Sequence, residues 1–308
     1  MKKLVSVIIP TYSRPTYLVR SVRSVLNQTY SCIEVLVIDD NNPNTQGRRE
    51  TEAVMRQFKN DKRVKYIQHP KNLNGSAARN SGIANSKGEY IALLDDDDEF
   101  LPQKIELQVK KLEDLDDSWG GCYCSYQFSL KNKPYRKIEK LEEGNLLESL
   151  LLIKNSICGG STLMIRKSVF EELQGFDTSF RRYQDWEFLV RFFRRYKLAQ
   201  SKEVLTNINM DSRINAGSAK NAIEFKEKFL NEFEKDIDKL PNRNLIYKTH
   251  WFLVANLLFE KRSYFLAIQM LKRAKTYSPI SFRDIAYCIF NIIEGIIPVK
   301  KLIQRRML

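Results

Sequence analysis

Four consecutive aspartates, Asp95 to Asp98, stand between the apolar run YIALL and the segment EFLP. Carboxylates this close repel one another unless a hard cation or several hydrogen-bond donors neutralise them. Mg²⁺ and Mn²⁺ prefer such oxygen ligands, and they commonly bring a phosphate as a further ligand. The tetrad therefore indicates metal-assisted chemistry on a phosphorylated substrate. A solvated loop or a helix start, where acidic residues are also favoured, is the alternative.

Histidine and cysteine add little chemistry to this picture. The chain has two histidines far apart in sequence, His69 and His250, and five cysteines without a CxxC pair. An imidazole metal site, Ser-His-Asp catalysis, a zinc site and a disulfide framework are therefore not expected. Unpaired cysteines fit a reducing cytoplasm. Any metal ion has to be held by oxygen ligands.

The first hundred residues must position the aspartates, and they alternate between strand and helix patterns. Apolar runs predict buried strands at 4–10, 34–40, 63–69 and 89–95, and helices are predicted at 15–28 and 76–86. This alternation is typical of a parallel sheet covered by helices. Polar residues follow three of the strands, and open α/β sheets bind ligands at the carboxyl ends of their strands. A ligand site is predicted at that edge.

The pattern changes after residue 101. We expect a helix at 102–115, less regular strands at 122–130 and 161–167, a strong helix at 182–196, and mainly helices after Asn221. With 308 residues, of which 43% are hydrophobic, the chain can form a sizeable core. No run of ~18 apolar residues occurs, and the short N-terminal run ends at a proline, so neither a membrane span nor a signal peptide is expected.

The C-terminal part carries a helical pattern of its own. Trp251, Val254, Ala255, Tyr264, Ala267, Leu271, Ala274 and Pro279 have the spacing of one tetratricopeptide repeat. A single repeat cannot bury its apolar face, so it would pack on residues 223–240 and 281–297 as a small helical extension. Chance resemblance is the alternative to this hypothesis.

Positive charge is concentrated in the same region. The net charge is +14, and residues 241–308 contain twelve Lys or Arg against three acidic residues. Segment 281–308 is apolar for about four helical turns and then basic, as in a buried cap or an interfacial helix with a cationic collar. An anionic membrane surface or a lipid-linked phosphate is the predicted partner, and simple solubility is the alternative. Nucleic acid is not expected.

Six segments in this order resemble family 2 glycosyltransferases over about residues 4–218: VSVIIPTYSRP, EVLVIDDNN, NLNGSAARNSGI, GEYIALLDDDDEFLP, GFD and QDWEFLVR. The resemblance implies the GT-A fold, an α/β domain with a Rossmann-like nucleotide-binding half and a mixed sheet. The implied division is a glycosyltransferase domain at 1–220, with the nucleotide at 1–101 and the acceptor at 102–220. A small α-helical extension follows at 221–308.

The resemblance also implies a nucleotide-binding set. It comprises Pro10, Thr11, Tyr12, Asp39, Asp40, Asn74, Gly75, Arg79, Asp95, Asp96 and Arg213. Tyr12 could stack on the base, with a helix start capped by Ser13 as the alternative. A carboxylate of Asp39 or Asp40 facing an N–H edge would favour UDP or dTDP over CMP, whereas an Asx turn would leave them structural. Arg79 could clamp the diphosphate or brace an aspartate.

Within the tetrad, Asp95 and Asp97 align with the outer residues of the family's DxD motif. Asp97 is the expected direct ligand of Mn²⁺ or Mg²⁺, and Asp95 its partner on the ribose or on a metal-bound water. Asp96 and Asp98 are expected to support them. Arg213 lies where relatives often carry an arginine for the diphosphate, but Asn215 replaces the histidine that often follows, so a histidine ligand is not expected there.

Asp185 is the implied catalytic base, which removes a proton from the acceptor hydroxyl. The family places this base in a Glu-Asp pair before WxxxxR, and here the pair is Gln184-Asp185, followed by Trp186. Stabilisation of a helix N-terminus is the alternative role for Asp185. Gly160, Ser161, Gln184 and Trp186 are the implied acceptor-binding residues.

These features together predict an inverting, metal-dependent glycosyltransferase. It would move a sugar from a nucleoside diphosphate, with UDP favoured, to a hydroxyl of a lipid-linked glycan in capsule or O-antigen synthesis. We expect it in the cytoplasm, peripheral on the inner face of the membrane. A sugar nucleotidyltransferase is one alternative, although PTYSRP does not match that class's Gly-rich loop. An inactive scaffold using the helical hairpin is another, and the presence of Asp95, Asp97 and Asp185 counts against it.

Overall fold

The computed structural model describes residues 2–131, 133–139, 142–154, 157, 159–211 and 219–296. The chain divides into two compact units. We call them the sheet unit, Met1–Leu147 with Asn155–Ile214, and the helical unit, Glu148–Lys154 with Asn215–Leu308. Each unit has its own core and is described by itself.

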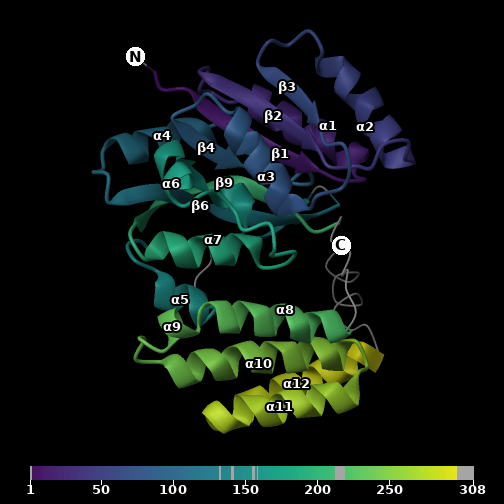
Figure 1. Cartoon of the computed structure of the whole chain (residues 1–308), viewed down its shortest axis with the longest axis vertical. Coiled ribbons are helices and arrows are strands. Elements are labelled where there is room, and N and C mark those ends of the chain that lie inside the picture. Colours follow the sequence, from purple (N-terminus) through teal and green to yellow (C-terminus); the bar gives the residue numbers. More distant parts are fainter. Residues whose placement is uncertain are drawn as a thin grey trace. The chain divides into compact units, whose positions relative to one another are not determined.

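The described part of the sheet unit is built on one nine-stranded mixed sheet, in the order β3-β2-β1-β4-β8-β6-β9-β5, with β7 paired to β6 (Figure 1). The strands are β1 (Val5–Thr11), β2 (Ile33–Asp39), β3 (Val64–Gln68), β4 (Tyr90–Leu93), β5 (Glu99–Phe100), β6 (Trp119–Leu130), β7 (Lys133–Ile138), β8 (Met164–Arg166) and β9 (Lys197–Asn209). The first four strands run parallel, and β4 pairs antiparallel with β8. The predicted α/β class with a mixed sheet is confirmed.

Helices cover both faces of the parallel strands. The helices of this unit are α1 (Pro15–Leu26), α2 (Gln46–Met55), α3 (Gly75–Asn85), α4 (Lys104–Glu113), α6 (Lys167–Glu172) and α7 (Gln184–Phe193). Side chains alternate along a strand, so Val7 faces a core shared with α1 and α4. Ile8 faces the other way and meets Gly82 of α3, where an added Cβ would lie 2.4 Å from Ile8 Cγ2. Only glycine allows this close approach of helix and strand.

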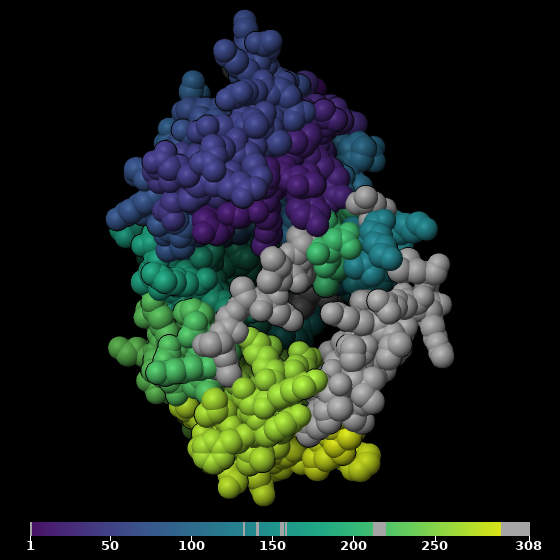
Figure 2. All heavy atoms as spheres, turned by 90° about the vertical axis from the view of Figure 1, so that its right-hand side faces the viewer, coloured from purple at the N-terminus to yellow at the C-terminus, as the bar shows by residue number. Residues whose placement is uncertain are grey.

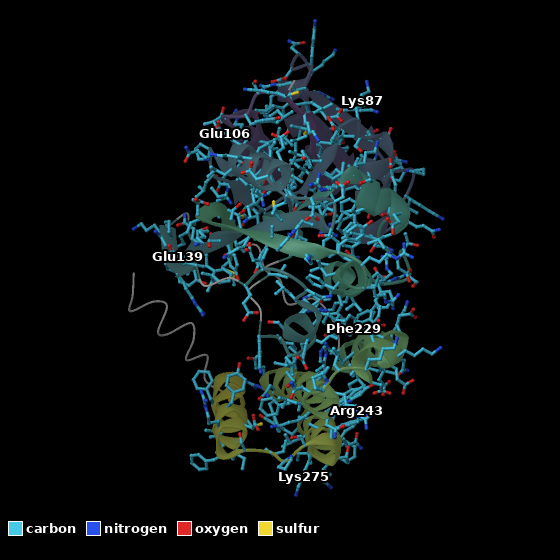
Figure 3. The ribbon with its side chains drawn as sticks, turned by 90° about the vertical axis from the view of Figure 1, so that its left-hand side faces the viewer. Lys87, Glu106, Glu139, Phe229, Arg243 and Lys275 are labelled. Carbon is cyan, nitrogen blue, oxygen red and sulfur yellow. The ribbon has the colours of Figure 1, made fainter. Side chains whose placement is uncertain are left out.

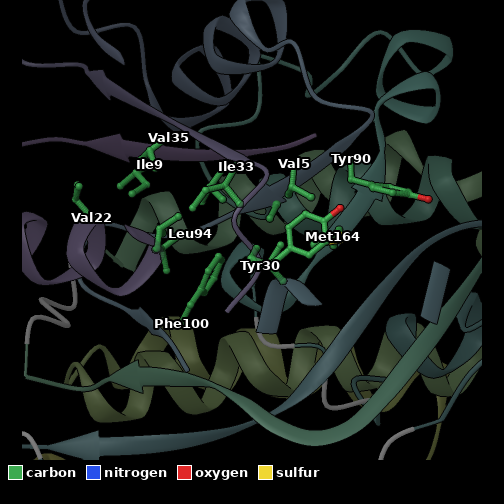
Figure 4. Close-up of a cluster of buried hydrophobic side chains, with 14 of the residues drawn as sticks. Val5, Ile9, Val22, Tyr30, Ile33, Val35, Tyr90, Leu94, Phe100 and Met164 are labelled. Atoms are coloured by element: carbon green, nitrogen blue, oxygen red, sulfur yellow. The ribbon is translucent and has the colours of Figure 1, made fainter. Parts of the chain in front are cut away.

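The main core lies between the parallel strands and α1 (Figure 4). Leu18, Val22 and Val25 recur at helical spacing on α1, and all three are fully buried. Each contributes about 1.5–3 kcal/mol relative to an exposed side chain. They pack on strand residues such as Ile9 and Val35, which Figure 4 labels. The apolar stripe read from the sequence is therefore what seats α1 on the sheet.

Several local expectations differ from the structure. Residues 160–162 form a 3₁₀ turn, so the strand predicted at 161–167 begins only at Met164. Ser13 does not cap α1: Arg14 is the N-cap residue and Pro15 the first helical residue, while the Ser13 backbone and hydroxyl bond to Asn41. No element was predicted for the residues of α2, β7 or β9.

The helical unit contains α8 (Ala219–Glu232), α9 (Glu234–Ile237), α10 (Arg243–Glu260), α11 (Tyr264–Tyr277) and α12 (Phe282–Ile296). All of α5 (Leu147–Leu151) except its first residue also belongs to this unit. The helices α10 and α11 form a helical hairpin in the predicted region, with Trp251, Ala255, Ala267 and Ala274 buried (Figure 1). Among the described residues, none of the helices is both long and apolar enough to cross a bilayer.

Candidate active site

The carboxyl ends of β1, β2 and β4 meet at one edge of the sheet. Thr11 is in register with Asp39, and the Leu94 amide donates to the Ile8 carbonyl at 3.0 Å. The chain therefore leaves β4 beside the end of β1. The loop Asp95–Asp98, which we call the acidic loop, begins at this point and closes as a turn, with the Asp98 amide donating to the Asp95 carbonyl at 3.1 Å.

Helix α1 holds the backbone of the acidic loop. The Ser21 hydroxyl lies 2.8 Å from the Asp96 carbonyl and 2.6 Å from the Asp98 carbonyl, and Arg20 Nη2 donates to the Asp97 carbonyl at 3.2 Å. A backbone fixed in this way determines where each aspartate side chain points.

Asp96 points toward the end of β1. It accepts from Thr11 Oγ1 at 2.8 Å and from the Tyr12 amide at 3.4 Å, and the Arg14 guanidinium lies 3.4 Å away. Burial raises its pKa to about 7, which Arg14 opposes and Asp97 reinforces. Asp96 is thus tied to the predicted nucleotide-binding segment.

Asp97 and Asp98 have different partners. Arg14 Nη1 donates to Asp97 Oδ2 at 2.7 Å. Asp98 accepts from the Ser161 hydroxyl at 2.6 Å and from the Asn209 amide at 2.9 Å. Burial raises the Asp98 pKa well above its usual range, and the charges of Asp95 and Asp97 add to that effect. Residues from β9 and from the 160–162 turn therefore support a loop that belongs to the first half of the chain.

Asp95, Asp97 and Asp98 form a group suited to a divalent cation. Each can offer one carboxylate oxygen, and these oxygens lie within 4.8 Å of one another. Oxygen-only donors of net negative charge fit Mg²⁺ or Mn²⁺. Arg14 pairs with Asp97 and Arg79 with Asp95, whereas Asp98 accepts only from neutral donors among the contacts described above. The group includes both predicted ligands and adds Asp98, which we expected only to support them.

A pocket of about 290 Å³ lies at the same sheet edge. Its lining gathers residues from five segments: Pro10, Thr11, Tyr12, Arg14, Asp40, Gly75, Ala78, Arg79, Asp95, Asp96 and Gln184. Eight of the predicted nucleotide-binding residues are among them. Tyr12 is half exposed, at 52%, and so presents its ring at the pocket. Arg14 is a lining residue that sequence reasoning missed, although its place before Pro15 at the start of α1 offered a signal.

The neighbouring aspartates Asp39 and Asp40 differ in their surroundings. Asp39 is fully buried and is bonded by Asn41, Tyr66 and Arg48. Asp40 lines the pocket, and its carboxylate is oriented by four donors. These are His69 Nδ1 at 2.7 Å, the Leu73 amide and Asn72 Nδ2 at 2.8 Å, and the Asn74 amide at 2.9 Å. Of the pair, Asp40 is the one that lines the pocket, and each of its carboxylate oxygens already accepts two hydrogen bonds.

Arg79 connects the acidic loop to α7. Its Nη2 donates to Asp95 Oδ1 and its Nη1 to Gln184 Oε1, both at 2.8 Å. A Cβ at Gly75 would lie 2.9 Å from Gln184 Oε1 and 3.1 Å from Arg79 Nη1, so glycine makes room for this chain of contacts. The alternative reading of Arg79 as a brace for an aspartate is what the geometry shows. Its contact with a diphosphate stays a prediction.

Asp185 lies in the first turn of α7, partly buried. The Gly160 backbone amide bonds to its carboxylate, whereas its Oδ1 is buried and has no hydrogen-bond partner among the described residues. Burial raises the Asp185 pKa, with Arg79 opposing and Asp95 reinforcing the shift. A carboxylate with one free oxygen and increased proton affinity can act as a general base. Its position also matches the helix-terminus alternative.

The remaining predicted residues are placed as follows. Ser161 is buried, and its hydroxyl accepts from the Asp95 amide at 3.0 Å as well as bonding Asp98. Trp186 packs its ring against Tyr183, with ring centres 5.6 Å apart. Asn74 caps α3 through the Ser76 and Ala77 amides. Arg213 lies outside the described residues. Contacts of these residues with substrate stay predictions.

Comparison with known proteins agrees with this arrangement. The family model for glycosyl transferase family 2 matches residues 6–174. An uncharacterised glycosyltransferase of Rickettsia prowazekii is 30% identical over 278 residues, which is 89% of this chain and 85% of the relative.

Two solved structures share the fold. Staphylococcus aureus TarS 1–349, in complex with UDP-GlcNAc, has a TM-score of 0.67 at 14% identity and matches over 96% of this chain and 89% of TarS. The mannosyltransferase PcManGT of Pyrobaculum calidifontis, in complex with GDP-Man and Mn²⁺, has a TM-score of 0.58 at 16% identity over 97% of this chain and 88% of that one. The predicted GT-A fold is confirmed. The chain belongs to glycosyl transferase family 2 and is a glycosyltransferase.

Proposed function

We propose that this protein is an inverting glycosyltransferase that uses a divalent cation and a UDP-sugar. The observation that carries the proposal is the meeting of the pocket, the three-carboxylate group and Asp185 at one end of the sheet. The pocket offers Tyr12 for stacking on a base. The N–H edge of uracil would take the place of one of the four donors on the Asp40 carboxylate, whereas cytosine presents an acceptor there. The complexes of TarS with UDP-GlcNAc and of PcManGT with GDP-Man support a nucleotide-sugar donor.

Asp95, Asp97 and Asp98 would hold Mn²⁺ or Mg²⁺, as the Mn²⁺ complex of PcManGT also suggests. Once bound, the cation supplies positive charge beside the diphosphate leaving group. Arg14 and Arg79 contact aspartates of the loop and line the pocket, so their guanidinium groups would be available to the phosphate oxygens of a bound nucleotide. Asp96 stays bonded to Thr11 and keeps the loop next to the pocket.

Asp185 would perform the proton transfer. Its carboxylate removes the proton of the acceptor hydroxyl while that oxygen forms a bond to the anomeric carbon. The bond from the anomeric carbon to the diphosphate breaks at the same time, so the nucleoside diphosphate leaves with the electron pair and the anomeric configuration inverts. The Gly160 amide fixes the carboxylate, and its free Oδ1 is the atom that accepts the proton.

The substitution Asp185→Asn tests this assignment. We expect transfer to fall by roughly 10²–10⁴-fold because only the proton acceptor is lost, while binding of UDP and Mn²⁺ measured by calorimetry is retained. Asp61→Asn is the matched control, since Asp61 pairs with Arg63 in a turn outside the site. Undiminished turnover of Asp185→Asn would show that Asp185 is not the catalytic base. Loss of UDP binding in that variant would indicate that Asp185 contributes to the donor site instead.

We further propose that the acceptor is a lipid-linked glycan of the cell envelope and that the protein binds the membrane surface peripherally. The helical unit exposes large apolar side chains on α11 and α12, with Phe265 at 74% and Phe282 at 85% exposure. Phe282, Ile285 and Ile289 share one face of α12. The surface of these helices is coloured yellow-green to yellow in Figure 2. The basic segment 297–308 lies outside the described residues.

Sedimentation with vesicles tests membrane binding. Phe265→Ser combined with Phe282→Ser should reduce the fraction that sediments with vesicles of anionic phospholipid, because interfacial binding scales with buried apolar area. Tyr135→Ser, which removes an exposed aromatic side chain of the sheet unit, is the control. Equal sedimentation of the double variant and the wild type would contradict the proposal.

A further inference from the structure

The helical unit carries a hollow of about 310 Å³ whose lining combines aromatic and polar side chains. It lies where the start of α10, the end of α11 and α9 come together. Figure 3 labels Arg243 at the start of α10 and Lys275 near the end of α11. The volume is at the lower end of the roughly 300–1,000 Å³ typical of small-molecule sites. Nothing in the proposed transfer reaction uses these residues.

Two tyrosines of the α10–α11 hairpin, Tyr247 and Tyr277, form an aromatic side of this hollow. Since α10 and α11 run antiparallel, Tyr247 near the start of one meets Tyr277 at the end of the other. Their rings stack with centres 4.9 Å apart and an interplanar angle of 22°. Both side chains line the hollow and are only partly buried, so each offers a polarisable ring to a ligand. The Tyr247 hydroxyl donates to Asp238 Oδ1 at 3.3 Å and so orients that carboxylate.

Trp251 also lines the hollow, and its indole N–H is a buried donor. It is 1% exposed, and the Arg273 guanidinium covers its ring at 3.7 Å from the centre. Its indole N–H has no hydrogen-bond acceptor among the described residues. A buried donor without an acceptor costs free energy, and a ligand oxygen would remove that cost.

The charges around the hollow are balanced. Glu234 and Asp238 contribute two carboxylates, and Arg243 and Arg273 contribute two guanidinium groups. Arg273 is also bonded to Glu227 at 2.5 Å. A phosphate or an acidic polymer would meet the carboxylates at close range, and a cationic ligand would meet the guanidinium groups. The lining therefore favours an uncharged ligand rich in both donors and acceptors.

From these features we infer that the helical unit binds an uncharged glycan in this hollow. Neighbouring sugar hydroxyls can donate to Asp238 and Glu234 and accept from Arg273 and the Trp251 N–H. The apolar C–H face of a sugar ring packs on the tyrosine pair. The site is a glycan-binding site additional to the transfer centre, and its existence does not depend on the proposed donor or cation.

The indole N–H resonance of Trp251 is the reporter for a direct test. The chain has three tryptophans, and Trp251→Phe assigns its signal by removal in ¹⁵N-edited NMR spectra of the full chain. Lactose, maltotriose and N,N′-diacetylchitobiose would be titrated separately up to about 10 mM, which reaches affinities in the millimolar range. We expect at least one of them to shift this signal to saturation.

Variants then locate the binding. Asp238→Ala should weaken the affinity about tenfold or more because it removes a charged hydrogen-bond acceptor. Trp251→Phe should weaken it severalfold, as measured by saturation-transfer NMR of the sugar. Lys275→Ala, an exposed change on α11 outside the lining, should leave it unchanged. Asp97→Asn should also leave it unchanged, which separates this site from the proposed cation and donor site.

Three results would overturn the inference. One is the absence of any saturable shift of the Trp251 signal with all three sugars. Another is wild-type affinity in Asp238→Ala. The third is a saturable shift caused by inorganic phosphate or by an acidic peptide in place of the sugars, which would assign the hollow to an anionic ligand.

Discussion

Two sets of buried ionisable groups, one in each unit of this protein, are arranged differently. In the sheet unit, one set of such groups gathers at one edge of the sheet, where Asp40, Asp96, Asp97, Asp98 and Arg79 lie beside the pocket or in the group suited to a cation. In the helical unit, Lys226 and His250 form a separate pair. His250 Nε2 lies 2.8 Å from the Leu151 carbonyl, which can only accept, so Nε2 carries the proton and Nδ1 accepts from Lys226 at 2.9 Å.

The difference separates two uses of buried charge. The acidic loop keeps like charges together, and burial together with the charges of Asp95 and Asp97 raises the Asp98 pKa. A bound cation would relieve this repulsion. The Lys226–His250 pair closes its hydrogen bonds within the protein. Substitutions in the first group should therefore change activity more than stability, and those in the second should do the reverse.

Among the substitutions in the acidic loop, Asp98→Asn should have the largest effect on activity. It keeps the shape of the side chain but removes one charge from the three-carboxylate group, so we expect about a 10³-fold loss of cation-dependent turnover. The measurement is turnover against Mn²⁺ concentration. Asp96→Asn is the matched control and should lose much less, because Asp96 is not among the three clustered carboxylates. Equal losses in the two variants would remove Asp98 from the proposed cation site.

His250→Ala should be the most damaging substitution for stability. The ring stacks on Phe229 at 5.7 Å and bonds Lys226 and Leu151, so its loss leaves a cavity and breaks two buried hydrogen bonds. We expect the free energy of unfolding of the helical unit to fall by about 2–4 kcal/mol in denaturant titrations. Turnover of the folded protein should change less than twofold. A large loss of turnover at unchanged stability would contradict the idea that this pair affects stability more than activity.

Ser161→Ala should have a moderate effect on cation use. Removing the hydroxyl frees Asp98 Oδ2 and the Asp95 amide, and loss of such supporting contacts typically costs 10–100-fold in metal affinity. The apparent affinity for Mn²⁺ in the transfer assay is the quantity to measure. Ser125→Ala is a matched control, since the buried Ser125 hydroxyl has no hydrogen-bond partner among the described residues. A similar change in both variants would argue for a general packing effect.

Acidic pH should lower the free energy of unfolding of the helical unit by less than the substitution His250→Ala does. Burial, with a contribution from Lys226, holds the His250 pKa well below 6.5 in the folded protein. The unfolded chain therefore binds more protons below about pH 6.5, so the stabilisation is complete above that pH and is lost as the pH falls. The slope is at most about 1.4 kcal/mol per pH unit. The free energies of unfolding of the wild type and of His250→Gln, measured between pH 7.5 and 5.5, give this slope. Equal slopes in the two proteins would show that His250 is not the group responsible.

The parallel half of the sheet was readable from sequence because its strands are continuous apolar runs that end in polar residues. Strand β9 was missed because its thirteen residues mix polar and apolar side chains, with exposed Lys202 and Glu203 in its middle, where the pairing with β6 shifts register. Helix α2 was missed because few of its residues are apolar, and it buries Arg48, Thr51 and Met55.

The site was predictable as a set of residues but not as a set of contacts. The resemblance to the family's DxD motif implied Asp95 and Asp97, whereas the inclusion of Asp98 in the carboxylate group depends on the side-chain directions within a tight turn. Those directions are set by Ser21, Ser161 and Asn209, which lie far away in sequence. No local pattern reports contacts of this kind.

The Asn209 amide donates a hydrogen bond to Asp98, so the end of β9 would take part in the energetics of the proposed cation binding. If cation binding and the position of this strand end depend on each other, thermodynamic linkage requires the dependence to be equal in both directions. A molecule that displaces the end of β9 would then alter cation affinity by the same factor by which the cation alters affinity for that molecule. We therefore expect substitutions after β9 to appear first as changes in the Mn²⁺ dose response.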